Sequence, residues 1–297
     1  MIVRDTPRLF ELLFAVRGSV LPRISPRILG FVLFSVAIVI IDSDLLRLPH
    51  TSVSALAGFG IALSLFLGFR NNAAYDRWWE GRRLWGQLIA DVRSLGRETD
   101  LFLANPQLRE KLLRTTIAFL HLHRMQLRKL PSSRKAQEWC GESFSEAPHP
   151  PCAAMDRMNE ILVEAKREGA LDGFGAKALT ERLSSIAFAQ AGCERIATTP
   201  LPFVYSLLVF RTTYLYALLL PFALLDSAGW MTPVFVGVVA YVFFGLAEVT
   251  EELAHPFGET VNSLPLDAMC RTMEISISKH LNLIPPAPLK PDRFYLS

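Results

Sequence analysis

The chain has 297 residues, of which 51% are hydrophobic, and its mean hydropathy is +0.29. This apolar content is higher than in ordinary soluble domains, and it is concentrated in long runs without charged residues. The net charge of +3 is too small to indicate a nucleic-acid partner. Four cysteines are widely spaced in segments that we expect to be cytoplasmic, so we predict no disulfides.

Four apolar stretches indicate membrane-spanning helices, each of which needs about 20 residues. They are Ile28–Ile41 with its flanking leucines, His50–Phe69, Ile196–Leu225 and Ser227–Ala247. Only the third contains a charged residue, Arg211. A charge inside an apolar stretch is costly unless it is paired or reaches water. Either Arg211 faces a water-filled cavity, or the third span consists of two shorter pieces.

Basic residues predict the orientation of these spans. Five arginines precede the first span: Arg4, Arg8, Arg17, Arg23 and Arg27. Because positively charged flanks stay in the cytoplasm, we expect residues 1–27 to be a cytoplasmic segment. This segment has no uninterrupted apolar core followed by a small-residue cleavage site, so we predict no cleaved signal peptide there. Four crossings, at 28–70 and 196–247, then leave 71–195 and the C-terminal segment 248–297 in the cytoplasm.

The cytoplasmic region is predicted to be helical. Apolar and charged residues recur at helical spacing in Arg70–Arg97, Gln107–Lys129, Met155–Arg167 and Ala176–Ala197. We expect a loop over Leu130–Pro151, a short helix near Asp267–Leu281 and an extended proline-rich tail over Ile284–Pro291. No segment alternates as strands do, so the predicted fold class is all-α.

The second span carries an apolar stripe formed by Ile61, Leu65 and Phe69, which are spaced four residues apart and share one helical face. Small residues lie between them, and small residues let membrane helices approach closely. The stripe is either an ordinary lipid-facing or packed surface, or the lining of a pore whose apolar constriction gates ions by loss of water.

Acidic residues and one histidine follow the fourth span, at Glu248, Glu251, Glu252, His255 and Glu259. Such a group either binds a cation or forms a solvated face beside the basic segment. The sequence contains no phosphate-binding glycine loop, nucleophile elbow or metalloprotease helix motif. We therefore expect neither enzymatic activity nor a cofactor.

Several short motifs resemble the bestrophin family, in particular its bacterial branch. They are Gly68-Phe69-Arg70-Asn71 through Glu80, Ala191-Gly192-Cys193-Glu194-Arg195-Ile196, Pro256-Phe257-Gly258 and Leu264-Pro265-Leu266-Asp267. These motifs occur in the expected order over most of the chain.

The resemblance implies a homopentameric ion channel in the bacterial inner membrane, helical throughout, with a central pore. It maps the three apolar rings of the family's pore neck onto Ile61, Leu65 and Phe69, and a second, cytoplasmic constriction near Leu179. The partners it implies are further copies of the chain, monovalent ions and the lipid bilayer.

One departure from the family pattern concerns calcium. Animal bestrophins follow Pro-Phe-Gly with an acidic run that helps to bind activating calcium, whereas Glu259 is the only carboxylate of the corresponding run here. Ion choice also stays open, because animal members resemble anion channels, bacterial relatives are regarded as cation-conducting, and an apolar neck contains no charge. The alternative to a channel is a non-conducting membrane-anchored sensor or scaffold whose cytoplasmic region binds a partner.

Overall fold

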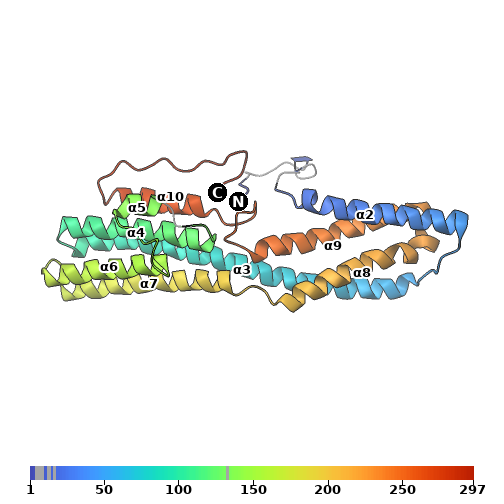
Figure 1. Ribbon diagram of the computed structural model, residues 1–297, viewed down its shortest axis with the longest axis horizontal. Helices are drawn as coiled ribbons and strands as arrows, with labels where there is room; N and C mark the ends of the chain where they lie inside the picture. The colour runs from blue at the N-terminus through green and yellow to red at the C-terminus, as the bar shows by residue number, and fades with distance from the viewer. Residues whose placement is uncertain (4–9, 12–14, 16–17, 132–133) are drawn as a thin grey trace. The chain divides into compact units, whose positions relative to one another are not determined.

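The computed structural model describes residues 1–3, 10–11, 15, 18–131 and 134–297, and these residues are almost entirely helical or in loops. The helices are α2 (Leu21–Ile40), the π-helical η1 (Ile41–Leu45), α3 (Val53–Phe102), α4 (Pro106–Leu127), α5 (Arg134–Cys140), α6 (Pro150–Arg167), α7 (Gly173–Thr198), α8 (Phe203–Ala228), the 3-10 turn η2 (Gly229–Met231), α9 (Thr232–Ala254) and α10 (Leu266–Ser278) (Figure 1). The predicted all-α class is confirmed.

The chain divides into two compact units. Asp5–Trp78 and Pro200–His255 form one, which we call the apolar unit. Met1–Arg4, Trp79–Thr199 and Pro256–Ser297 form the other, which we call the polar unit. The first part of α3 belongs to the apolar unit and its remainder to the polar unit.

The apolar unit packs α2 against α9 and α8, and α8 against α9. One of its buried clusters joins Leu63 and Leu67 of α3 to Val209 and Leu220 of α8. Rings of α2, α8 and α9 also meet: Phe31 stacks on Phe244 with centroids 5.6 Å apart. The core of this unit is therefore built from aliphatic and aromatic side chains.

A glycine permits one close helix contact within the apolar unit. A Cβ on Gly60 of α3 would lie 2.7 Å from the hydroxyl oxygen of Tyr216 on α8. A residue larger than glycine would have to displace that ring, so this small residue allows α3 and α8 to approach each other, as small residues commonly do between membrane helices.

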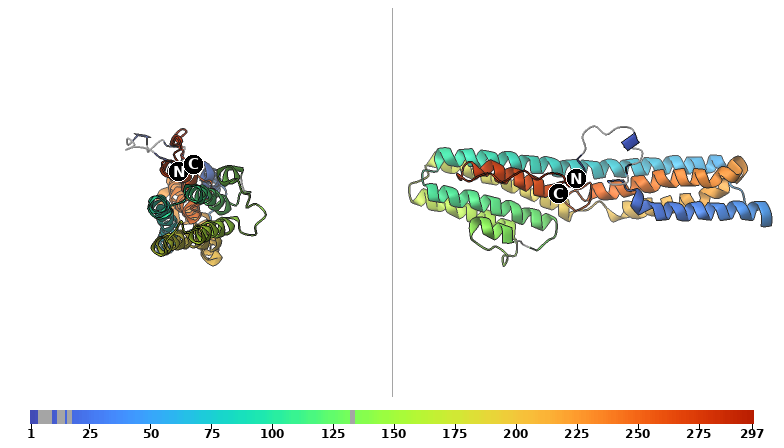
Figure 2. Two further views of the ribbon diagram at one scale, coloured as in Figure 1. Left: turned by 90° about the vertical axis from the view of Figure 1, so that its left-hand side faces the viewer. Right: turned by 90° about the horizontal axis from the view of Figure 1, so that it is seen from above.

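The polar unit packs α4 against α5, α6, α7 and α10, and Figure 2 shows the dark red α10 alongside the green helices. Its core contains fully buried side chains from five helices: Trp85, Leu88, Ile117, Phe119, Ile161, Leu179, Ile186 and Met273. Asn105 and Asp172 cap α4 and α7 through side-chain oxygens that accept backbone N–H bonds.

Buried polar pairs also link helices of the polar unit. Asp91 of α3, only 1% exposed, accepts hydrogen bonds from Arg182 at 2.7 Å and Ser185 at 2.7 Å on α7. His121 of α4 lies 2.7 Å from the carboxylate of Glu274 on α10, and both side chains are buried. Burial therefore encloses charge here as well as apolar surface.

Within the described residues, three segments are long and apolar enough to cross a membrane: Leu21–Leu45, Val53–Phe102 and Phe203–Ala254, the last comprising α8, η2 and α9. The predicted start of the third span was wrong, because α7 continues to Thr198 and a break before Phe203 separates it from α8. Pro200 and Pro202 occupy that break, and proline has no N–H to continue a helix.

Two other expectations concern the predicted loop between α4 and α6 and the arginines before the first span. The predicted loop Leu130–Pro151 contains a short helix, α5, because Arg134–Cys140 is free of proline and glycine. Of the five arginines used for orientation, Arg4, Arg8 and Arg17 lie outside the described residues.

All four cysteines are described and free. Cys193 and Cys270 are buried, Cys140 is half-buried and Cys152 is exposed. Burial raises the pKa of Cys193, and it raises the pKa of Cys270 to about 12.

Candidate functional site

The apolar stripe of α3 is exposed within the single chain. Ile61, Leu65 and Phe69 are 64%, 57% and 69% exposed. These values are high for large apolar side chains of a candidate span, and burial of such surface away from water is favourable. A membrane, a second chain or a pore interior must therefore account for this surface.

The opposite side of α3 makes the contacts with the rest of the apolar unit. Leu63 and Leu67 each follow a stripe residue by two positions, about 200° further round the helix, and both are buried against α8. The stripe therefore points away from the core of its own chain.

Small residues border the stripe. Gly58 and Gly68 lie on its side of α3, and a Cβ at either position would meet no described atom within 4 Å. This surface therefore has room for another helix to approach, whereas the space beside Gly60 is already occupied by the ring of Tyr216.

The position of Leu179 is different from the one expected. It is fully buried within the polar unit, on the side of α7 that faces the core. A side chain without exposed surface cannot line a lumen, so the predicted constriction at Leu179 was wrong. The exposed aromatic residues of α7 are Phe174 and Phe188.

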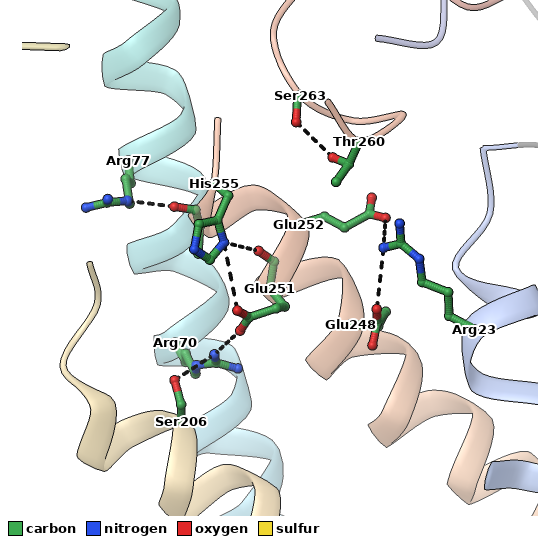
Figure 3. A network of polar contacts seen from close by, with 11 residues as sticks. Arg23, Arg70, Arg77, Ser206, Glu248, Glu251, Glu252, His255, Thr260 and Ser263 are labelled. Carbon is green, nitrogen blue, oxygen red and sulfur yellow. Dashed lines mark hydrogen bonds and ion pairs between the residues drawn. The ribbon is translucent and has the colours of Figure 1, made fainter. Parts of the chain in front are cut away.

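Arginines engage two of the carboxylates that follow the fourth span. Arg23 of α2 donates to Glu252 at 2.5 Å and lies 3.5 Å from Glu248 on α9 (Figure 3). Arg27 lies 3.5 Å from the other oxygen of Glu248. The buried carboxylate of Glu252 is thus partnered by a cation from α2.

A second arginine from α3 engages the next carboxylate. Arg70, at the end of the stripe, donates to Glu251 at 2.8 Å and to the hydroxyl of Ser206 at 3.0 Å (Figure 3). Nδ1 of His255 lies 3.8 Å from the Glu251 carboxylate. Arg77 donates to the carbonyl oxygen of Ala254 at 2.7 Å. These contacts join α3, α8 and the end of α9.

The arrangement of these carboxylates and arginines can be compared with the cation site predicted after the fourth span. Within the described part of the chain, no group of three or more His, Cys, Asp and Glu side chains is arranged to hold a metal ion. Glu259 belongs to the polar unit and is exposed. Cation binding by Glu251, Glu252, His255 and Glu259 stays a prediction, and the arginine contacts are what the structure adds to it.

Several of the other motif residues make structural contacts in the polar unit. Glu80 and Arg195 form an ion pair, and the ring of Phe257 packs over Gly81. Arg124 and Arg128 of α4 both contact the carboxylate of Asp267. Burial alone would raise the pKa of Asp267, but the hydrogen bond from Arg128 and the charge of Arg124 outweigh it and lower that pKa.

The sequence analysis did not assign partners to Arg23, Arg27 and Arg70. A signal was present, because each arginine stands at or near an end of an apolar stretch and the carboxylates after the fourth span are spaced three and four residues apart. The partners are distant in sequence: 181 residues separate Arg70 from Glu251. A single sequence does not reveal such pairs.

Comparison with known proteins identifies the relatives of this chain. Residues 1–279 match the bacterial and fungal bestrophin protein family. The chain belongs to the bestrophin family. A Mesorhizobium japonicum protein named as voltage-dependent anion channel-forming is 44% identical over 100% of this chain and 97% of its own length. YneE of Escherichia coli, named likewise, is 39% identical over 99% of each.

Bestrophin structures agree with this assignment. The crystal structure of a bacterial bestrophin homologue from Klebsiella pneumoniae matches with a TM-score of 0.83 and 32% sequence identity, covering 88% of this chain and 100% of that one. The predicted family is confirmed, and with it the expectation of a membrane protein with apolar helices.

Proposed function

We propose that the chain is one subunit of a passive ion channel, in which the stripe of Ile61, Leu65 and Phe69 lines the narrow part of the pore. The observation that carries this proposal is the direction of the stripe, which faces away from the core of its own chain. Relatives named as anion channel-forming proteins support it.

A single α3 helix has one such stripe and cannot enclose a pore. We therefore propose a ring of identical subunits, five by likeness to bestrophins, with the open surface around Gly58 and Gly68 available to the neighbouring helix. In this arrangement α2, the first part of α3, α8 and α9 each cross a bacterial inner membrane, and both chain ends are cytoplasmic. A monomer in native mass measurements of detergent extracts would contradict the ring.

The stripe supports a gating role, but it does not indicate which ions the channel selects. Its side chains offer an ion no replacement for its hydration shell, so ion transfer through a narrow apolar tube is unfavourable, and water tends to leave it. Because the stripe contains no charge, it favours neither anions nor cations. Flux measurements with chloride or sodium replaced decide between them.

The experiment that tests the stripe compares ion flux per assembled oligomer in liposomes. We expect Ile61→Ala, Leu65→Ala and Phe69→Ala to increase flux, by about tenfold at the narrowest ring if truncation lowers the barrier by about 1.4 kcal/mol. The matched control is Leu33→Ala, since Leu33 is an exposed leucine of α2 with 59% exposure against 57% for Leu65. Unchanged flux in all three variants would contradict a pore stripe and favour a non-conducting scaffold.

A second narrow point belongs to α7 in this proposal, at Phe174 in place of Leu179. Phe174 is 84% exposed in the first turn of α7. Phe174→Ala is expected to change flux, whereas Phe188→Ala, at another exposed phenylalanine of the same helix, is expected to leave flux unchanged. The reverse result would assign the constriction to Phe188.

A further inference from the structure

The exposed face of α3 that carries the apolar stripe continues beyond Phe69. Asp76 lies eleven residues after Leu65, the middle residue of the stripe, and eleven residues turn an α-helix to within about 20° of the starting direction. The helix runs without a break from Val53 to Phe102, so this relation holds past the end of the stripe. Asn72 and Asp76 are both exposed. The same face of α3 therefore changes from apolar to polar and then to acidic.

The packing of α3 supports this direction for Asp76. Arg70 and Ala74 are 8% and 0% exposed, and they continue the buried side of the helix that begins with Leu63 and Leu67. Ala74 and Asp76 are two positions apart, which is about 200° round the helix. Asp76 therefore points away from the core of its own chain, as the stripe does.

The carboxylate of Asp76 has no hydrogen-bond or ion-pair partner among the described residues. The arginines nearest to it along α3 are engaged elsewhere in the apolar unit. Arg77 donates to the carbonyl oxygen of Ala254 at 2.7 Å, and Arg70 donates to the carboxylate of Glu251 at 2.8 Å. Both contacts reach the end of α9, so neither arginine pairs with Asp76.

Distance along the helix decides which charge acts most strongly at the end of the stripe. By helical rise, Asp76 lies about 10 Å beyond Phe69, whereas Arg83, a further seven residues along the same face, lies about 21 Å beyond it. Salt screens charges over about 8 Å at physiological ionic strength. Glu80, between them, is paired with Arg195. The charge of Asp76 therefore dominates at the end of the stripe.

We propose that Asp76 determines the ion selectivity of the channel. In the proposed ring of subunits, the Asp76 side chains form a ring of carboxylates just beyond the apolar neck. This ring concentrates monovalent cations and repels anions, as rings of acidic side chains do in cation channels. The inference rests on the proposed channel function and deepens it, because the stripe contains no charge and leaves the choice of ion to charges beside it.

The test is the reversal potential of the reconstituted protein in a planar bilayer that separates two KCl concentrations. We expect the wild type to pass K⁺ more readily than Cl⁻. Asp76→Asn should lower the ratio of K⁺ to Cl⁻ permeability by about fivefold, and Asp76→Lys should reverse the preference. Asp76→Glu keeps the charge and should keep the preference. The difference between wild type and Asp76→Asn should shrink when both KCl concentrations are raised, because salt screens the ring.

Two control variants test the position of the charge. Asp156→Asn removes an exposed aspartate of α6, which carries no part of the stripe, and should leave the permeability ratio unchanged. Arg83→Gln should change the ratio by much less than Asp76→Asn, because Arg83 lies further from the neck. Native mass measurement shows whether each variant assembles.

The outcomes separate this inference from the channel itself. A wild type that carries no current would overturn both. Conduction with the same permeability ratio in wild type, Asp76→Asn and Asp76→Lys would overturn the carboxylate ring and leave the channel intact. Loss of the oligomer in Asp76→Asn and Asp76→Lys, with the ratio unchanged in the remaining channels, would overturn it as well, since Asp76 would then pair with a neighbouring subunit.

Discussion

The two units use the same kind of ion pair in different surroundings. In the apolar unit the arginine–carboxylate pairs gather near the end of α9, and the core contains aliphatic and aromatic side chains. In the polar unit, the buried carboxylate of Asp91 on α3 pairs with Arg182 on α7, and the buried carboxylate of Glu274 pairs with Arg271 within α10. The comparison shows that charged pairs lie at the edge of the core in the apolar unit and within the core in the polar unit. Loss of a charge partner should therefore matter most in the polar unit.

The largest effect is expected at Asp91. Arg182→Ala would leave the buried carboxylate of Asp91 with Ser185 and Gln87 as its hydrogen-bond donors among the described residues. Breaking a buried pair by removing one partner costs about 3 to 5 kcal/mol, and the partial exposure of Arg182 favours the lower value. Thermal unfolding in detergent, with hydrogen exchange of the α7 amides, measures this loss.

A matched control lies in the same unit. Arg157 pairs with Glu142 at 2.9 Å, but that carboxylate is much more exposed than Asp91. Arg157→Ala is therefore expected to reduce the free energy of unfolding by less than about 1 kcal/mol. Equal losses in the two variants would mean that burial does not separate these pairs.

The next effect concerns a neutral histidine in the core of the polar unit. The ring of His123 stacks on Trp85 at 5.7 Å and on Phe119 at 5.8 Å. Burial, with a smaller contribution from His149, lowers its pKa from 6.5 to about 3. The unfolded chain binds this proton more readily, so the histidine lowers stability as the pH falls from 6.5 towards 3.

His123→Phe should remove this acid sensitivity while keeping the ring stack. At a pH of about 4.5, we expect the variant to exceed the wild type in stability by on the order of 2 kcal/mol more than at neutral pH. Melting curves across this pH range measure the difference. His255→Gln, at an exposed histidine of the apolar unit, serves as the control. Parallel curves for His123→Phe and wild type would exclude His123 as the source.

The smallest effect tests packing in the apolar unit. Gly60→Ala places a methyl group against Tyr216 and should reduce stability in detergent by about 1 to 2 kcal/mol. Gly30→Ala on α2 meets no described atom within 4 Å, and better helix propensity should make it neutral or slightly stabilising. A stabilised Gly60→Ala would show that α3 and α8 are packed less closely there.

The sequence predicted elements better than contacts. The continuity of α3 through Arg70 was readable because no proline interrupts its apolar and charged stretches. The stripe itself was readable as a pattern, yet Leu63 and Leu67 are equally apolar. Which face packs inside the chain depends on α8, more than 100 residues away in the sequence. Periodicity cannot supply that information.

The errors have a similar origin. The predicted third span began too early because it was defined by apolar content alone. Ile196 and Ala197, at the end of α7, are apolar and were therefore counted with the residues of α8. Leu179 was assigned to a lumen by resemblance, although leucine at that helical position equally suits a core. Distinguishing the two required the neighbouring helices of the polar unit, against which Leu179 is fully buried.

The four free cysteines have a consequence for experiments in solution. Thiolates are the reactive form, and burial holds Cys193 and Cys270 in the thiol form as well as shielding them from reagents. Cys152 is exposed in the first turn of α6, outside the candidate spans. A mild maleimide reaction should therefore attach a fluorophore mainly at Cys152. The native chain thus offers a position for a spectroscopic reporter without an engineered cysteine.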